Sequence, residues 1–140
     1  MSQNPRDSNS LKSNRAFSLV EVLAAVGIIG IIAFLAVPNI VAIKADSERN
    51  LAISRAEALN MAVVSYIQAN GRANVASSWS SANNNSRYTN LIPYLSFAPN
   101  TLTDYTPNGY SITLPTNLNS LQKSVLIDVS DPKNPKNVPY

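Results

Sequence analysis

Residues 17–43 read FSLVEVLAAVGIIGIIAFLAVPNIVAI, and Glu21 is the only charged side chain among these 27 residues. As an α-helix the stretch is about 40 Å long, which exceeds the roughly 30 Å hydrocarbon core of a membrane. Its inner part, residues 22–37, is apolar on every side, as is typical of a helix surrounded by lipid or by other apolar helices. The sequence therefore predicts a membrane-spanning helix over residues 17–43.

The segments on either side of this helix predict its orientation. Residues 1–16 contain three basic and one acidic side chain, a formal net charge of 3 − 1 = +2, whereas residues 17–140 contain eight basic and seven acidic side chains. Residues just beyond the helix, 44–49, are balanced in charge. Because basic residues are retained on the cytoplasmic side, we expect residues 1–16 in the cytoplasm and residues 44–140 on the opposite side.

Glu21 is the residue that a plain membrane anchor does not explain. A carboxylate near a membrane core costs several kcal/mol, so such residues are usually paired or functional. Arg15, six residues earlier, lies on another helix face. We therefore expect Glu21 to meet a partner outside its own segment.

A cleaved secretory signal peptide is the disfavoured alternative for this segment. Signal peptides have a shorter apolar core than residues 17–43, and an A-x-A-like cleavage site follows that core. Residues 37–39 of this chain do not provide such a site.

The composition disfavours several kinds of chemistry. The chain has no cysteine and no histidine, which excludes disulfides, thiolate catalysis, the usual zinc sites and the commonest general base. A Gly-rich phosphate loop and a dense carboxylate pair are also missing from the sequence. We predict that the protein is not an enzyme. A membrane-anchored enzyme and a single-pass membrane-anchored binding module remain the alternatives of another class.

Residues 15–23, RAFSLVEVL, resemble the class III prepilin signal shared by type IV pilins and type II secretion pseudopilins. In that family a prepilin peptidase removes a short basic leader on the cytoplasmic side and N-methylates the new first residue. The resemblance implies cleavage between Ala16 and Phe17, an N-methyl-Phe17, and a mature chain of 140 − 16 = 124 residues. The family favours Gly before the cut, whereas this chain has Ala16.

The resemblance also implies roles for Glu21 and Pro38. Cleavage creates an amine on Phe17, and in a stack of helices this amine can lie against Glu21 of another subunit. Such a pair offsets charge in a low-dielectric setting and sets the axial register of assembly. Pro38 stands where many members have a helix-kinking proline, and a proline inside a helix removes one backbone hydrogen bond.

The rest of the chain predicts a small α+β head. Apolar residues recur at helical spacing and predict a buried stripe of Ala52, Ala56, Leu59, Val63, Tyr66 and Ile67. We expect one helix from about residue 17 to 69, ending at Asn70-Gly71. The Ser/Asn-rich residues 74–90 predict a loop, and residues 88–97 a short helix.

Residues 110–114 and 124–129 predict two strands that pair as an antiparallel hairpin, followed by an irregular tail over residues 131–140. The expected fold is a long N-terminal helix, its first half transmembrane, with a small antiparallel sheet packed on its second half. The expected organisation is a cleaved leader over 1–16, a transmembrane or filament-core helix over 17–43, and a soluble head over 44–140 that includes the rest of the helix.

No cofactor is predicted, and calcium is the only metal considered. Asp128 and Asp131 can supply oxygen ligands, but Ca²⁺ takes six or more, so a turn at the end of a strand is the favoured interpretation. Nucleic-acid binding is not predicted either, because three basic residues in 44–57 alternate with three acidic ones.

The predicted function is that of a structural subunit of a type IV pilus-like filament. The missing cysteines exclude the disulfide of many type IV pilins, which favours a type II secretion pseudopilin. A type IV pilin for adhesion, motility or DNA uptake is the alternative. The resemblance implies that the partners are other pilin-like subunits, the prepilin peptidase, membrane lipid, an inner-membrane assembly platform and a cytoplasmic ATPase. We expect a single pass through the inner membrane with a periplasmic head, and then a periplasmic or extracellular filament.

Overall fold

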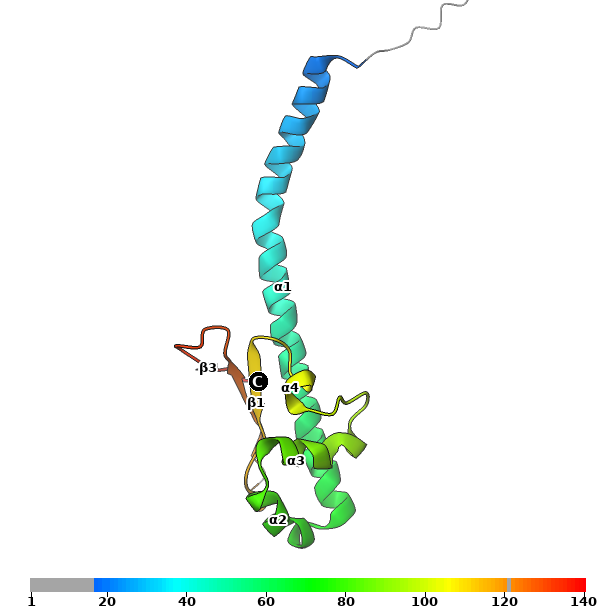
Figure 1. Cartoon of the computed structure of the whole chain (residues 1–140), viewed down its shortest axis with the longest axis vertical. Helices are drawn as coiled ribbons and strands as arrows, with labels where there is room; N and C mark the ends of the chain where they lie inside the picture. Colours follow the sequence, from blue (N-terminus) through cyan, green and yellow to red (C-terminus); the bar gives the residue numbers. More distant parts are fainter. Residues whose placement is uncertain (1–16, 121) are drawn as a thin grey trace, which may run out of the picture. The chain divides into compact units, whose positions relative to one another are not determined.

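The computed structural model describes residues 17–120 and 122–140. The leader, with Ala16 and Arg15, lies outside the described residues. The chain divides into two compact units, Met1–Val41 and Ala42–Tyr140, and each is described by itself. The described elements are α1 (Leu19–Asn70), α2 (Arg72–Ser81), α3 (Asn84–Leu91), η1 (Ile92–Tyr94), α4 (Leu102–Tyr105), β1 (Tyr110–Thr113), β2 (Val125–Asp128) and β3 (Lys136–Asn137) (Figure 1).

The first unit is the apolar part of α1. The helix is long and apolar enough to cross a membrane, judged by its length and composition. Its large apolar side chains are exposed in this unit, on every side of the helix. Pro38 lies inside α1, which continues through it. Apolar surface of this extent needs lipid or other apolar helices around it, because water disfavours large exposed apolar patches.

The second unit is built on the later part of α1. The buried residues of α1 are Ala52, Ala56, Leu59, Ala62 and Val63, which confirms four of the six residues of the predicted stripe and adds Ala62. The other two, Tyr66 and Ile67, are partly buried and pack against the core. Three of the five buried residues are alanines, whose small side chains let the other segments of the head approach the helix closely. Gly71 follows the last helical residue with φ 79°, a conformation that a side chain would strain. The predicted helix end at Asn70-Gly71 is therefore correct.

The predicted loop over residues 74–90 is wrong, because α2 and α3 occupy most of it. Ser side chains in α2 bond carbonyls of the preceding turn, as Ser80 Oγ does to Ser77 O at 2.9 Å. The side chain of Asn83 caps α3 by accepting the N–H of Ser86 at 2.8 Å. Each helix also buries apolar residues, Val75 and Trp79 in α2 and Tyr88 and Leu91 in α3. This burial outweighs the low helix preference of Ser and Asn.

Trp79 and Arg87 connect these helices to the rest of the head. Trp79 is fully buried, its Nε1 donates to Pro115 O at 2.8 Å, and its ring lies 5.5 Å from that of Tyr66. Arg87 is buried too, and its guanidinium donates to Trp79 O at 3.0 Å and Ser80 O at 3.2 Å. These carbonyls end α2, so a cation there also complements the helix dipole. Arg87 therefore holds α2 and α3 together.

The predicted short helix over residues 88–97 is correct only in part. Helix α3 and the 3₁₀ turn η1 cover its first seven residues, and helical structure ends at Tyr94. The following turn contains Phe97, the only non-glycine residue with positive φ (55°) among the described residues. Because this left-handed conformation breaks a right-handed helix, the chain changes direction here before α4.

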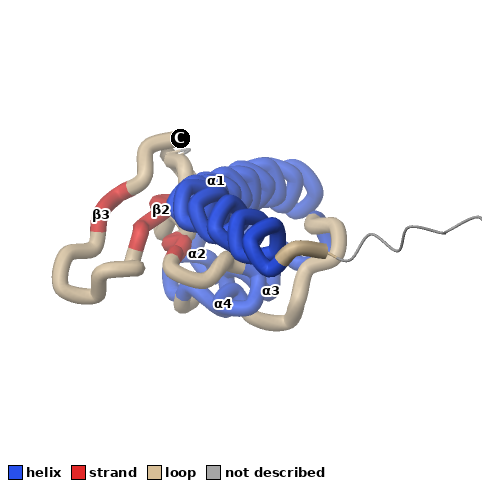
Figure 2. Tube along the Cα trace, turned by 90° about the horizontal axis from the view of Figure 1, so that it is seen from above, coloured by secondary structure: helices blue, strands red, loops and turns tan. Residues whose placement is uncertain are grey.

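The sheet confirms the predicted hairpin and corrects the predicted tail. Strands β1 and β2 pair antiparallel from Tyr110↔Asp128 to Thr113↔Val125. The tail was expected to be irregular, but β3 pairs antiparallel with β2, and both strands are labelled in Figure 2. The strand order of the sheet is β1-β2-β3. Pro135 and Pro139 flank this strand, and prolines, which cannot donate to a ladder, keep it short.

The sheet belongs to the same hydrophobic core as the second half of α1. Ile112 of β1 and Leu126 of β2 are buried in one cluster with Leu59 and Trp79. Ser124, just before β2, donates its backbone N–H to Asn60 Oδ1 of α1 at 2.8 Å. The expected α+β architecture, a long helix with a small antiparallel sheet on its second half, is therefore confirmed.

Tyr88 makes the stability of the head sensitive to alkaline pH. The side chain is fully buried and its hydroxyl donates to Pro99 O at 2.7 Å. Burial, with a smaller contribution from the neighbouring Tyr105, raises the pKa of Tyr88 from its ordinary 10.0 to about 12. The folded head therefore holds this proton more tightly than the unfolded chain does. The stabilisation is complete below pH about 10 and is lost as pH rises through about 12.

We expect Tyr88→Phe to flatten the loss of stability between pH about 10 and 12, because the proton that the folded head retains is gone. At neutral pH the variant loses one hydrogen bond, at a cost of about 1 kcal/mol. Chemical unfolding of both proteins across this pH range measures the difference. Equal pH dependence in the two proteins would contradict the assignment to Tyr88.

Candidate assembly site at the start of the long helix

Phe17 precedes the first turn of α1, and Glu21 lies within it. Phe17 precedes the helix and is 82% exposed. The backbone carbonyl of Ser18 accepts the N–H groups of Glu21 at 3.0 Å and Val22 at 3.2 Å, which starts the helix at this point. Glu21 is thereby held in the first helical turn, where an acidic side chain complements the helix dipole. The dipole accounts for an acidic residue here, although not for its place among apolar side chains.

The surroundings of Glu21 are apolar and exposed. Leu19, Val20, Val22 and Leu23 are all large, exposed hydrophobic residues. Within residues 17–120 and 122–140, the one ion pair joins Lys44 Nζ to Glu48 Oε1 at 3.8 Å. No cation of the described chain therefore neutralises Glu21. Once lipid or other helices cover its neighbours, this carboxylate needs a cation from elsewhere.

Gly27 and Gly30 lie on α1 beyond Glu21. A Cβ atom added to either glycine meets no atom within 4 Å. Packing within the chain itself therefore does not require glycine at these positions. Small residues of this kind allow two membrane helices to approach closely.

Asp128 and Asp131 each stabilise a local turn. Asp128 Oδ1 accepts from the Ser130 N–H at 2.9 Å and from Ser130 Oγ at 2.6 Å. The hydrogen bonds from Ser130, that of the side chain first, lower the pKa of Asp128. Asp131 Oδ1 accepts from the Lys133 N–H at 3.0 Å. The described part of the chain has no group of three or more His, Cys, Asp or Glu side chains that could hold a metal ion. Calcium binding was the less favoured interpretation of Asp128 and Asp131 in the sequence.

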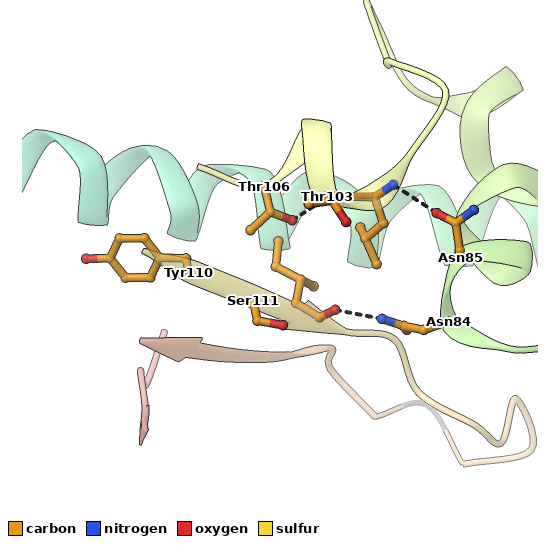
Figure 3. Close-up of a pocket in the computed structure, with 8 residues that line it drawn as sticks. Asn84, Asn85, Thr103, Thr106, Tyr110 and Ser111 are labelled. Carbon is orange, nitrogen blue, oxygen red and sulfur yellow. Dashed lines mark hydrogen bonds between the residues drawn. The ribbon is translucent and has the colours of Figure 1, made fainter. Parts of the chain in front are cut away.

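A polar cavity of about 290 Å³ lies between α3, α4 and β1 (Figure 3). Asn84 Nδ2 donates to Ile112 O at 2.8 Å, and Asn84 Oδ1 accepts the N–H of Leu114 at 2.8 Å. Asn85 Oδ1 accepts the N–H of Leu102 at 3.1 Å. The two amides thus tie α3 to the sheet and to α4. None of the residues lining this cavity is charged, so it has no acid–base pair.

Phe97 is an exposed residue that the sequence pattern does not distinguish. It was expected within a short helix, whereas the structure places it in a turn with φ 55° and leaves its side chain 100% exposed. Pro99, two residues later, is a nearby turn signal in the sequence. Neither the conformation nor the exposure could be inferred from that signal.

One comparison with known proteins matches the N-terminal segment. The family profile of the Prokaryotic N-terminal methylation motif matches residues 11–37. This span includes the Ala16–Phe17 bond and Glu21 and ends one residue before Pro38. Neither a curated protein nor a solved structure matches the chain. The resemblance drawn from residues 15–23 is confirmed, and the head lies beyond the matched span.

Proposed function

We propose that this chain, which carries the class III signal of pilin-like proteins, is a structural subunit of a type IV pilus-like filament. The motif implies processing by a prepilin peptidase and assembly with other pilin-like subunits. The observation that carries the proposal is Glu21, a lone carboxylate on an exposed apolar helix with no cation of the described chain beside it.

Assembly into a filament can supply the cation that Glu21 lacks within the described chain. Cleavage after Ala16 turns Phe17 into a chain end with a positive amine, four residues from Glu21. When helices of many copies bundle, the amine of one copy can neutralise Glu21 of the next. The same bundle covers the exposed apolar side chains of α1, which favours association. Pairing of the amine with Glu21 then fixes one axial position of each helix relative to its neighbours, whereas apolar contacts alone would permit many.

We propose further that the filament is that of a type II secretion pseudopilin. The absence of cysteine supports this assignment, because a disulfide-closed head of the type found in many type IV pilins cannot form. A type IV pilin for adhesion, motility or DNA uptake is the alternative. The basic leader supports an orientation with the N-terminus in the cytoplasm and the head in the periplasm. An inner-membrane platform and a cytoplasmic ATPase would drive assembly.

Mass spectrometry of the N-terminus tests the processing step. The mature protein is expected to begin at N-methylated Phe17 and to contain 124 residues, since 140 − 16 = 124. We expect Ala16→Gly to be cleaved at least as completely as the natural chain, and Ala16→Leu to retain its leader because the bond needs a small residue before it. Finding residues 1–16 intact in the mature natural protein would overturn this step.

A further inference from the structure

The chain contains two Asn-Gly pairs, Asn70-Gly71 and Asn108-Gly109. Asparagine is chemically labile in proteins, and it is most exposed to attack when glycine follows it. Glycine has no Cβ to block the approach of its own backbone nitrogen to the asparagine side chain, and its backbone rotates freely. Both asparagines are exposed to solvent, so exposure does not distinguish the two pairs. The hydrogen bonds around each pair do distinguish them.

The Asn70-Gly71 pair is held at both of its reacting groups. Asn70 is the last residue of α1, and its Nδ2 donates to Tyr66 O at 2.9 Å and to Tyr94 Oη at 3.1 Å. The backbone N–H of Gly71, which would supply the attacking nitrogen, donates to Ile67 O at 2.9 Å. A reaction at Asn70 therefore requires the end of the helix to unwind and all three hydrogen bonds to break.

The Asn108-Gly109 pair occupies the middle of a tight turn. The N–H of Tyr110 donates to Pro107 O at 3.2 Å, and Gly109 adopts φ 82°, as glycine does in a type II turn. Within the described residues, neither the side chain of Asn108 nor the N–H of Gly109 makes a hydrogen bond. The two reacting groups can therefore approach each other once this single turn opens.

We propose that Asn108 is a site of spontaneous deamidation in the folded protein and that Asn70 is protected from the same reaction. The Gly109 nitrogen forms a bond to Asn108 Cγ, the bond from Cγ to Nδ2 breaks, and the proton of the Gly109 N–H leaves with Nδ2 as ammonia. Water then opens the five-membered succinimide at either of its carbonyls, which leaves aspartate or isoaspartate. One water is consumed and one ammonia is released, with no oxidation or reduction. The modification needs no partner and is independent of the proposed function.

The modification adds a negative charge at the end of the β1–β2 hairpin that contains Asp128. Tyr110, two residues after Asn108, pairs with Asp128, and the N–H of Val129 donates to Gly109 O at 2.8 Å. Isoaspartate also lengthens the backbone by one atom, which displaces the Gly109 carbonyl from the N–H of Val129. The urea midpoint of the head is therefore expected to fall as the reaction proceeds. A midpoint that stays constant while Asn108 is converted would overturn this consequence.

Peptide mass spectrometry over time tests the proposal. The full-length protein is kept in detergent in a mildly alkaline buffer, with and without denaturant, and the conversion of each Asn-Gly pair is followed by the mass change from NH₂ to OH. Similar rates are expected in the unfolded chain, because the reacting groups are the same. In the folded protein we expect Asn70 to react at least about tenfold more slowly than Asn108. Equal rates at the two sites, or an unreactive Asn108, in the folded protein would overturn the proposal.

Two variants assign the difference to the groups named. Asn108→Gln lengthens the side chain, which disfavours the five-membered ring, so conversion at this position should be lost while that at Asn70 is unchanged. Tyr94→Phe removes the hydroxyl that accepts from Asn70 Nδ2, and it should raise the rate at Asn70 about threefold without changing that at Asn108. An unchanged rate at Asn70 in Tyr94→Phe would overturn the assignment of its protection to this hydrogen bond.

Discussion

Replacing Glu21 with Ala is expected to leave membrane insertion intact and to lower incorporation into filaments by about a hundredfold or more. Insertion depends on the apolar helix and the basic leader, which the substitution does not touch. Assembly loses the proposed partner of the Phe17 amine, and removing one member of a buried ion pair costs about 3–5 kcal/mol. Since each 1.4 kcal/mol is a factor of about ten, the effect on association is large. Quantifying the chain in membrane and filament fractions measures both parts.

Two further variants separate charge from shape at this position, and a third variant, at Glu48, is the control. Glu21→Gln keeps the size of the side chain and removes its charge, so it should resemble Glu21→Ala. Glu21→Asp keeps the charge and shortens the reach, so an intermediate result is expected. Glu48→Ala removes a carboxylate from the exposed pair with Lys44, which spans 3.8 Å, and should assemble normally. Normal filament incorporation of Glu21→Ala would refute the pairing of Glu21 with the Phe17 amine.

Trp79→Ala is expected to destabilise the head by about 3–5 kcal/mol, the range for removing a large aromatic side chain from a core. Trp79 is fully buried, packs against Tyr66 with ring centres 5.5 Å apart, and donates to Pro115 O at 2.8 Å. A domain of ordinary stability has only about 5–15 kcal/mol in total, so this loss is a large share. Urea unfolding of the full chain in detergent, followed by a signal from the head, measures the change.

Two controls identify the source of the destabilisation. Trp79→Phe keeps much of the ring but leaves Pro115 O without its donor, at a cost of about 1–3 kcal/mol. Met61→Ala truncates a side chain that is 72% exposed and should stay within about 0.5 kcal/mol of the natural protein. The expected order of stability is therefore Met61→Ala, then Trp79→Phe, then Trp79→Ala. An unfolding midpoint of Trp79→Ala equal to that of Met61→Ala would show that the ring does not stabilise the core.

The parts of the fold that the sequence predicted correctly have local patterns. The long helix follows from an uninterrupted apolar stretch and a continuing helical spacing of apolar residues, and both are visible within a few turns. The pairing of β1 and β2 follows from two short runs of β-forming residues separated by turn signals. The lone charge of Glu21 and the string RAFSLVEVL are likewise contiguous in the chain, which is why the assembly residues could be proposed without coordinates.

The parts that the sequence did not predict depend on distant contacts. Residues 74–90 have the composition of a loop, yet they contain most of α2 and most of α3. Their helices form because they bury Trp79 and Tyr88 against the rest of the head, and the hydrogen bond from Trp79 to Pro115 spans 36 residues. Strand β3 exists because residues of the tail reach the free edge of β2.

Hydropathy, charge and helical spacing within the chain were thus enough to identify the apolar helix, its leader and Glu21, because each is a property of neighbouring residues. The tertiary structure was needed for α2, α3 and β3, and for the conformation and exposure of Phe97. The physical reason is burial, since a residue is buried or exposed only when segments far apart in the chain have packed. For Phe97, which the sequence placed in a short helix, that packing left a strained and fully exposed aromatic ring.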